Sequence, residues 1–78
     1  MFINKNDGRN NFCGERIAQF RVAMKISQRE LADRMQLEGY MMDKNAIQRI
    51  EAGKRFITDI ELIGFSKVLD KSFDELLR

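Results

Sequence analysis

Hydrophobic residues recur every three to four positions through most of the chain after residue 13, with polar residues between them. Ile17, Phe20 and Met24 have this spacing and predict a first helix with one buried face. Leu31 and Met35 predict a buried face for a second helix, which begins after residue 27. Apolar and polar residues nowhere alternate strictly over the length of a strand, so we expect no β-strand.

A third, shorter helix is predicted between two residues that favour helix ends. The Asp43 carboxylate can cap its first turn, and Gly53 can adopt the left-handed conformation that often ends a helix. Between them, over residues 44–52, Ile47 and Ile50 lie three positions apart and define an inward face. The opposite face is polar, so we expect this helix at the surface.

Three segments have the form of a capping box, in which a Ser or Thr and a Glu three residues later each bond the other's backbone N–H. They span residues 27–30, 58–61 and 72–75 and predict the starts of the second, fourth and fifth helices. The last two helices have apolar residues at helical spacing: Leu62, Phe65, Val68, Leu69, Phe73, Leu76 and Leu77. Five amphipathic segments and no proline predict an all-α fold, a five-helix bundle.

The chain of 78 residues has room for one domain. Residues 1–13 contain many turn-forming residues and no sustained periodicity, so we predict a flexible N-terminal arm there and a folded domain over residues 14–78. The longest apolar runs are far shorter than the roughly 20 residues that cross a bilayer, and the first dozen residues are too polar for a signal peptide. We expect a cytoplasmic protein with no membrane partner.

The chemistry of the side chains argues against an enzyme and against a metal site. Cys13 is the single cysteine and the chain has no histidine, which rules out an internal disulfide and the usual zinc ligand sets. The sequence has no glycine-rich phosphate loop, and Cys13 lies in the predicted arm without a neighbouring base. We therefore predict no catalytic residue, no metal and no cofactor.

The net charge of +2 is unevenly distributed. Residues 1–29 have six basic and two acidic side chains, and residues 43–55 have four basic and two acidic ones, whereas residues 30–42 and 56–78 each have a net charge of −2. A face built from the two basic segments would attract phosphates. The same charges could also merely solvate helix surfaces, so charge alone does not decide between these interpretations.

Two stretches together resemble the helix-turn-helix family of Cro and the phage repressors, also called the xenobiotic-response-element type. They are residues 26–32 (ISQRELA) and residues 45–55 (NAIQRIEAGKR), and residues 72–77 (SFDELL) add to the likeness. The resemblance covers roughly residues 14–77. It implies five helices, of which the second and third form the motif, and it implies sequence-specific binding of double-stranded DNA by a small transcriptional regulator, most simply a repressor.

In such a motif the recognition helix, here residues 43–52, lies in the major groove. Its outward side chains are our candidates for reading bases, because Ile47 and Ile50 fix the inward side. Asn and Gln can pair with adenine, and Arg and Lys with guanine. The candidates are Lys44, Asn45, Gln48 and Arg49; read alone, they would be a plain exposed polar face.

The resemblance also assigns phosphate contacts and one structural ion pair. Phosphates would be bound at the start of the second helix by Gln28 and Arg29, and after the recognition helix by Lys54 and Arg55. The alternatives are that these residues only solvate a helix start or complement a helix C-terminus. Glu51 would pair with Arg21 of the first helix and hold the recognition helix in place.

The chain departs from the family pattern in the turn between the second and third helices. Residues 37–42 make this turn longer than the three or four residues usual for the motif. Tyr40 with Met41 or Met42 can tuck against the core, or this surface can contact DNA or a partner. In addition, Ile57 stands where many relatives have Pro before the fourth helix, although Thr58 can still cap that helix.

The family resemblance implies a homodimer on a pseudo-palindromic site, with half-sites about one helical turn apart. The fifth helix and the loop before it are the candidate dimer surface, unless Phe73 and Leu76 simply complete a monomer core. A different function on the same fold is a protein-interaction module of the antitoxin or anti-repressor type. Such a module should expose an apolar patch, for example at Phe73, Leu76 and Leu77.

Overall fold

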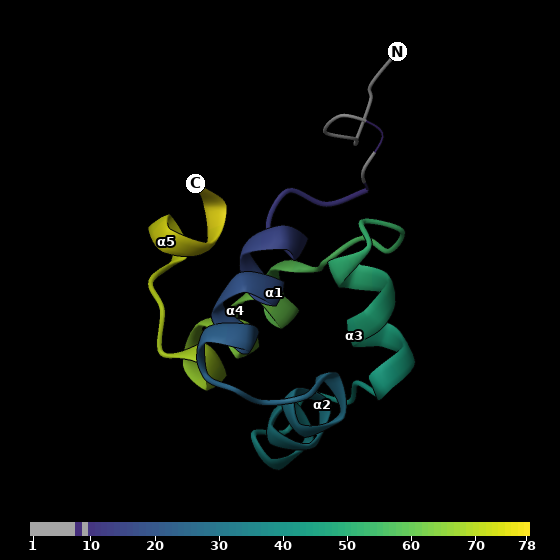
Figure 1. The fold of residues 1–78 in the computed structure, drawn as a ribbon, viewed down its shortest axis with the longest axis vertical. Coiled ribbons are helices and arrows are strands. Elements are labelled where there is room, and N and C mark those ends of the chain that lie inside the picture. Colours follow the sequence, from purple (N-terminus) through teal and green to yellow (C-terminus); the bar gives the residue numbers. More distant parts are fainter. Residues whose placement is uncertain (1–7, 9) are drawn as a thin grey trace.

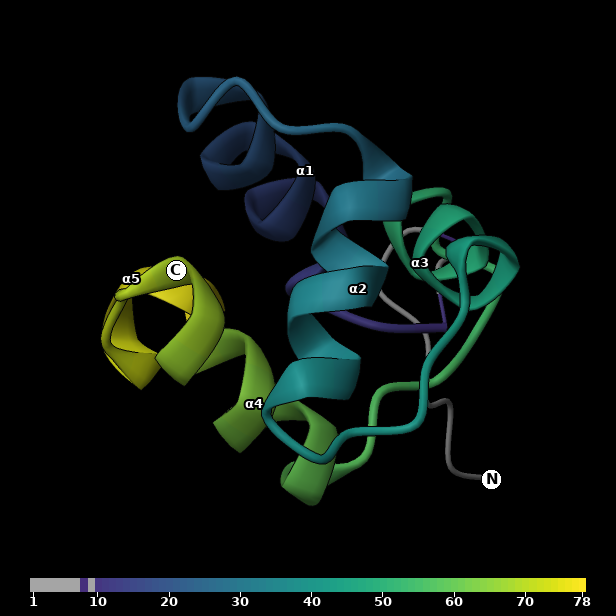
Figure 2. The same cartoon turned by 90° about the horizontal axis from the view of Figure 1, so that it is seen from below.

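The computed structural model describes residue 8 and residues 10–78, and these form five α-helices with no strand among them. They are α1 (Gly14–Ala23), α2 (Gln28–Leu37), α3 (Lys44–Glu51), α4 (Asp59–Leu69) and α5 (Phe73–Leu77). Helices α3 and α5 lie on opposite sides of the bundle, and α1, α2 and α4 lie between them (Figures 1 and 2). The predicted all-α, five-helix fold is confirmed.

Every helix contributes to one hydrophobic core. The buried apolar side chains are Ile17 of α1, Leu31, Ala32 and Met35 of α2, Ile47 and Ile50 of α3, Phe65 and Leu69 of α4, Leu76 of α5, and Cys13, Ile26 and Met42 between the helices. The predicted inward faces are therefore largely present. Met24 was predicted on the buried face of the first helix and is instead exposed, because α1 ends at Ala23.

Side-chain caps fix where four of the helices begin. Asp43 accepts from the N–H of Ala46 at the start of α3, and the predicted capping boxes that begin α4 and α5 are complete. The box predicted for α2 is only half present. Ser27 accepts from the N–H of Glu30, but the Glu30 carboxylate forms an ion pair with Arg34, one helical turn further on.

The long connection between α2 and α3 folds back onto the end of α2. Gly39 has a φ of 92°, a left-handed conformation that glycine adopts without steric cost, and this lets the Tyr40 N–H donate to the Met35 carbonyl over 2.9 Å. The Gln36 amide then donates to the Met42 carbonyl over 2.9 Å. Backbone and side-chain bonds thus order this turn despite its length.

Tyr40 and Met42 pack against the core. Met41 and Leu37, by contrast, are 86% and 85% exposed. The Tyr40 ring packs closely against α4 at Gly64, which has no side chain. A Cβ atom added at Gly64 would lie only 2.9 Å from the ring. The extra length of the turn therefore places Tyr40 and Met42 in the core and leaves Met41 outside it.

Residues 10–13, directly before α1, belong to the folded domain rather than to a flexible arm. The Asn10 N–H donates to the Gly53 carbonyl over 2.7 Å, and Asn11 and Cys13 are buried. The predicted boundary at residue 14 is therefore too late for residues 10–13, because backbone and amide hydrogen bonds hold this segment without any hydrophobic periodicity. Residues 1–7 and 9, which form most of the predicted arm, lie outside the described residues.

Candidate nucleic-acid interface

Helix α3 buries one side and exposes the other. Ile47 and Ile50 are fully buried, which turns the opposite side of the helix to solvent. The four predicted base-reading residues are all exposed and occupy positions that neighbour each other on the helix surface: Lys44, Asn45, Gln48 and Arg49. Because α3 lies at the edge of the bundle, this polar side is open to a large ligand (Figures 1 and 2).

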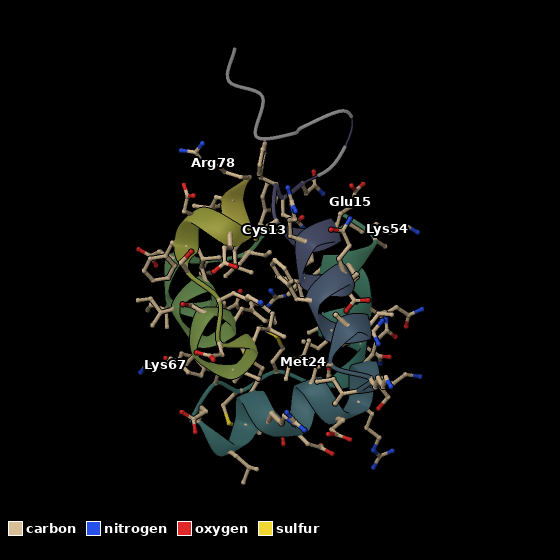
Figure 3. The ribbon with its side chains drawn as sticks, turned by 60° about the vertical axis from the view of Figure 1, so that its left-hand side comes forward. Cys13, Glu15, Met24, Lys54, Lys67 and Arg78 are labelled. Carbon is tan, nitrogen blue, oxygen red and sulfur yellow. The ribbon has the colours of Figure 1, made fainter. Side chains whose placement is uncertain are left out.

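Lys54 extends the polar side of α3 beyond the end of the helix. Together with Asn45, Gln48, Arg49 and Ala52 it lines an open hollow of about 400 Å³. Figure 3 shows Lys54 pointing away from the bundle, on the side opposite Lys67 of α4. The residue predicted to bind a phosphate thus adjoins three of the residues predicted to read bases.

A second hollow, of about 330 Å³, lies where α2 meets the start of α3. Two predicted DNA contacts, Arg29 and Lys44, line it together with two acidic residues, Asp33 and Asp43. All four side chains are exposed. The structure therefore brings Arg29 close to the recognition helix, in surroundings where the formal charges balance.

Arg21 and Glu51 form the predicted ion pair between α1 and α3. Arg21 Nε donates to Glu51 Oε2 over 2.7 Å and Nη2 donates to Oε1 over 3.1 Å, with the two side chains only 15% and 8% exposed. Arg21 Nη1 also donates to the Ile26 carbonyl over 2.8 Å. The guanidinium thus connects the last residue of α3 to the segment that precedes α2.

Gln28, a predicted phosphate donor, is part of this same network. Its Nε2 donates to Glu51 Oε1 over 2.9 Å, and the residue is half-buried. The side chain would have to leave Glu51 before that amide could bind a phosphate. Sequence reasoning paired Glu51 with Arg21 and did not foresee that the same carboxylate would also hold Gln28.

Arg55, the other predicted phosphate ligand after α3, is bound by Glu61 of α4. Its Nη1 and Nη2 donate to the two carboxylate oxygens over 2.9 and 2.8 Å, and Nη1 also donates to the Phe56 carbonyl. The hydrogen bonds from Arg55 lower the pKa of Glu61, and the bonds to Glu61 raise the pKa of Arg55. The structure thus places Arg55 in a two-bond ion pair that fixes the loop after α3.

Comparison with known families decides what this arrangement of helices is. A helix-turn-helix family model matches residues 17–76, which include α2 and α3 together with the helices that support them. The chain belongs to this helix-turn-helix family, of the Cro and phage-repressor type. Within it, α2 and α3 are the two helices of the motif.

A solved structure gives an independent view of the same helix-turn-helix domain. It is the crystal structure of the restriction-modification controller protein C.AhdI from Aeromonas hydrophila, which superimposes with a TM-score of 0.71 at 25% sequence identity. The match covers 81% of this chain and 84% of that one. Among curated proteins, none matches the sequence. Both similarities support the family and its fold.

Two features of this helix-turn-helix domain escaped sequence reasoning. Asn11 lies against the end of α3, where its amide donates to the carbonyls of Ile50 and Arg55. Glu61 serves both in the capping box of α4 and in the ion pair with Arg55. The capping box was visible in the sequence, but the partner of Arg55 was not, because only the folded loop brings the two side chains together.

Proposed function

We propose that this domain is a transcriptional regulator that binds double-stranded DNA in a sequence-specific manner, with α3 in the major groove. The exposed side of α3 supports this proposal most directly. Its four polar side chains, Lys44, Asn45, Gln48 and Arg49, can all donate hydrogen bonds to base edges. An eight-residue helix at the edge of a bundle has the size and position to enter that groove. We assign no catalytic residue to the domain.

We assign base reading to Lys44, Asn45, Gln48 and Arg49. The Asn and Gln amides suit adenine, and the Arg and Lys side chains suit guanine. Lys54, beside these residues, supplies a phosphate contact after α3, and Arg29 supplies one at α2. Gln28 and Arg55 can join them only by exchanging their bonds to Glu51 and Glu61 for bonds to phosphate.

We further propose that the domain binds DNA as a homodimer through the surface of α4 and α5. Both helices expose apolar side chains: Ile60 and Ile63 on α4, and Phe73 and Leu77 on α5. Leu77 also lines one hollow with Phe12, which extends this surface toward the start of α1. Because α5 lies on the opposite side of the bundle from α3, a partner here would leave the recognition helix open (Figures 1 and 2).

The same apolar surface also fits the alternative function, a protein-interaction module on this fold. Of the three residues that this alternative expects to be exposed, Phe73 and Leu77 are exposed, and Leu76 is buried in the core. We favour DNA binding because α3 has a polar exposed side next to Lys54, which the alternative does not require. The similarity to a controller protein points the same way.

A selection of random DNA duplexes against the purified chain tests the function. We expect a palindromic motif to be enriched. Asn45→Ala and Arg49→Ala should each then weaken binding to that motif by roughly 5- to 100-fold, with a much smaller effect on random duplexes. Lys54→Ala is the matched control, because loss of a phosphate contact weakens binding to both duplexes by similar factors.

Two outcomes would contradict DNA reading by α3. If no motif is enriched, the interaction module becomes the better assignment. If a motif is enriched but Asn45→Ala and Arg49→Ala weaken both duplexes equally, the side chains of α3 do not read bases.

A further inference from the structure

The segment before α1 hydrogen-bonds three successive backbone carbonyls just after the recognition helix. The Asn10 N–H donates to the Gly53 carbonyl over 2.7 Å, and the Asn10 amide donates to the Lys54 carbonyl over 3.2 Å. The Asn11 amide donates to the Arg55 carbonyl over 2.8 Å. Residues 10 and 11 therefore bind the backbone of the loop that contains Lys54.

Asn11 also bonds the recognition helix and α1. Its Nδ2 donates a second hydrogen bond, over 2.9 Å, to the carbonyl of Ile50 in the last turn of α3. Its Oδ1 accepts from the N–H of Gly14, the first residue of α1, over 2.9 Å. A single side chain thus uses two donors and one acceptor to connect α1, α3 and the loop after α3.

Asn11 is buried, so its side-chain amide needs hydrogen-bond partners within the protein. Asn11 is only 9% exposed, and among the described residues it is the polar one that counts as buried. A buried amide without partners is costly, so the side chain has a strong preference for this one arrangement. Few replacements can reproduce it: Asp has the same shape but no donor for the two carbonyls, and Ala has neither donors nor acceptor.

We propose that Asn11 is a positioning residue for DNA binding, which fixes the end of α3 and places Lys54 against a phosphate. The inference rests on the proposed function of α3 and assigns to it a residue far away in the sequence. Binding constellations need their supporting residues to hold them within about 0.5 Å of the working geometry. Lys54 follows the helix in a loop, and a loop holds such a geometry only when its backbone is tied down.

The test is a double-mutant cycle in the full chain, using the duplex obtained from the selection. Affinities are measured by titration for wild type, Asn11→Ala, Lys54→Ala and the double variant, at a temperature where all are folded by circular dichroism. We expect Asn11→Ala to weaken binding about tenfold, which corresponds to 1.4 kcal/mol. We also expect Lys54→Ala to cost much less in the Asn11→Ala background than in wild type, because Lys54 has already lost its position.

Val68→Ala is the matched control for stability. Val68 is a half-buried apolar residue of α4 and makes no bond to the loop, so its truncation destabilises the domain without moving Lys54. Lys54→Ala should therefore cost the full factor in the Val68→Ala background. If Asn11→Ala proves too unstable to measure, Asn10→Ala provides a milder variant, which removes one bond to the loop and keeps the backbone bond to Gly53.

The outcomes separate this inference from the proposed function. If the wild-type chain binds the duplex and Lys54→Ala weakens binding by the same factor in every background, Asn11 does not position Lys54. The proposed DNA binding would then stand. A wild-type chain that binds no duplex would overturn both. A smaller effect of Lys54→Ala in the Asn11→Ala or Asn10→Ala background, together with the full effect in the Val68→Ala background, supports the positioning role. A purely structural defect would reduce the effect in the Val68→Ala background as well.

Discussion

The Glu51 carboxylate accepts hydrogen bonds from two other helices, which makes it the most consequential charged side chain near α3. Arg21 of α1 and Gln28 of α2 both donate to it, and it is 8% exposed. Removing it leaves a mostly buried guanidinium without its carboxylate and a half-buried amide without its acceptor.

We predict that Glu51→Ala lowers the free energy of unfolding by about 2–4 kcal/mol, as judged from the cost of breaking a buried pair from one side. Urea unfolding followed by circular dichroism measures this change. Glu30→Ala is the matched control, because its ion pair with Arg34 is exposed and should contribute below about 1 kcal/mol. If both variants lower the free energy of unfolding by similar small amounts, the buried network stabilises the domain no more than an exposed ion pair does.

Predictability from sequence differed among these side chains for a physical reason. Lys44, Asn45, Gln48 and Arg49 could be placed on one exposed side because Ile47 and Ile50 fix the orientation of α3. The pairing of Arg21 with Glu51 came from the family resemblance. The bonds of Gln28 to Glu51 and of Arg55 to Glu61 could not be predicted, because a side chain on a helix start or in a loop can choose among several partners that only the fold brings near.

The loop between α3 and α4 is held at both ends by charged or amide side chains. Glu61 is central to this, because its carboxylate accepts two bonds from Arg55 and one from the Thr58 N–H. Arg55 and Glu61 are mostly shielded from solvent, with side chains 30% and 16% exposed. The Glu61 carboxylate therefore holds the α4 end of this loop, and it does so only when ionised.

We predict that Glu61→Gln lowers the free energy of unfolding by about 1–3 kcal/mol at pH 7, since hydrogen bonds to a charged group are lost. The pKa of Glu61 is lowered in the folded chain, above all by Arg55. Its stabilising contribution is therefore complete above about pH 4.3, the ordinary value for Glu, and is lost as the pH falls further, through the folded pKa.

Urea unfolding of wild type and Glu61→Gln from pH 7 down to pH 3 measures this dependence. The difference between the two should be constant from pH 7 to about pH 5 and shrink below that. Glu38→Gln, at an exposed residue directly after α2, controls for a general loss of acidic charge. A difference between wild type and Glu61→Gln that persists unchanged to pH 3 would mean that the ion pair is not its source.

The helices themselves were largely predictable, and the connections were not. Apolar spacing and end-capping residues located all five helices, because both signals are local in sequence. Residues 10–13 were assigned to the arm because Asn10 and Asn11 are typical of turns, and nothing local shows that their amides reach the loop some 40 residues away. The long turn was recognised, but the sequence left open which of Met41 and Met42 is buried, because both have apolar side chains of the same size.

The described part of the domain has two unlike surfaces on opposite sides. The side of α3 is polar, whereas α4 and α5 expose Ile60, Ile63, Phe73 and Leu77. No helix of the described residues is long and apolar enough to cross a membrane. Exposed apolar side chains on a small domain favour contact with another protein, and the proposed homodimer would cover those of α4 and α5.

We predict that Ile63→Asp disrupts the proposed homodimer, because it places a charge among apolar side chains that the partner would cover. Sedimentation velocity should show dimers for wild type and monomers for Ile63→Asp at the same concentration. Binding to the palindromic duplex should weaken strongly, while binding to a single half-site stays the same, because α3 is untouched.

Leu37→Asp is the matched control, because Leu37 is 85% exposed and lies at the end of α2, outside the α4 and α5 surface. It should leave both the oligomeric state and the affinity for the palindrome unchanged, which separates a specific interface from a general effect of removing exposed apolar area. If Leu37→Asp and not Ile63→Asp produces monomers, the dimer forms through the long turn between α2 and α3. If wild type is already monomeric on and off the palindrome, the α4 and α5 surface is left for a different protein partner, as the interaction-module function expects.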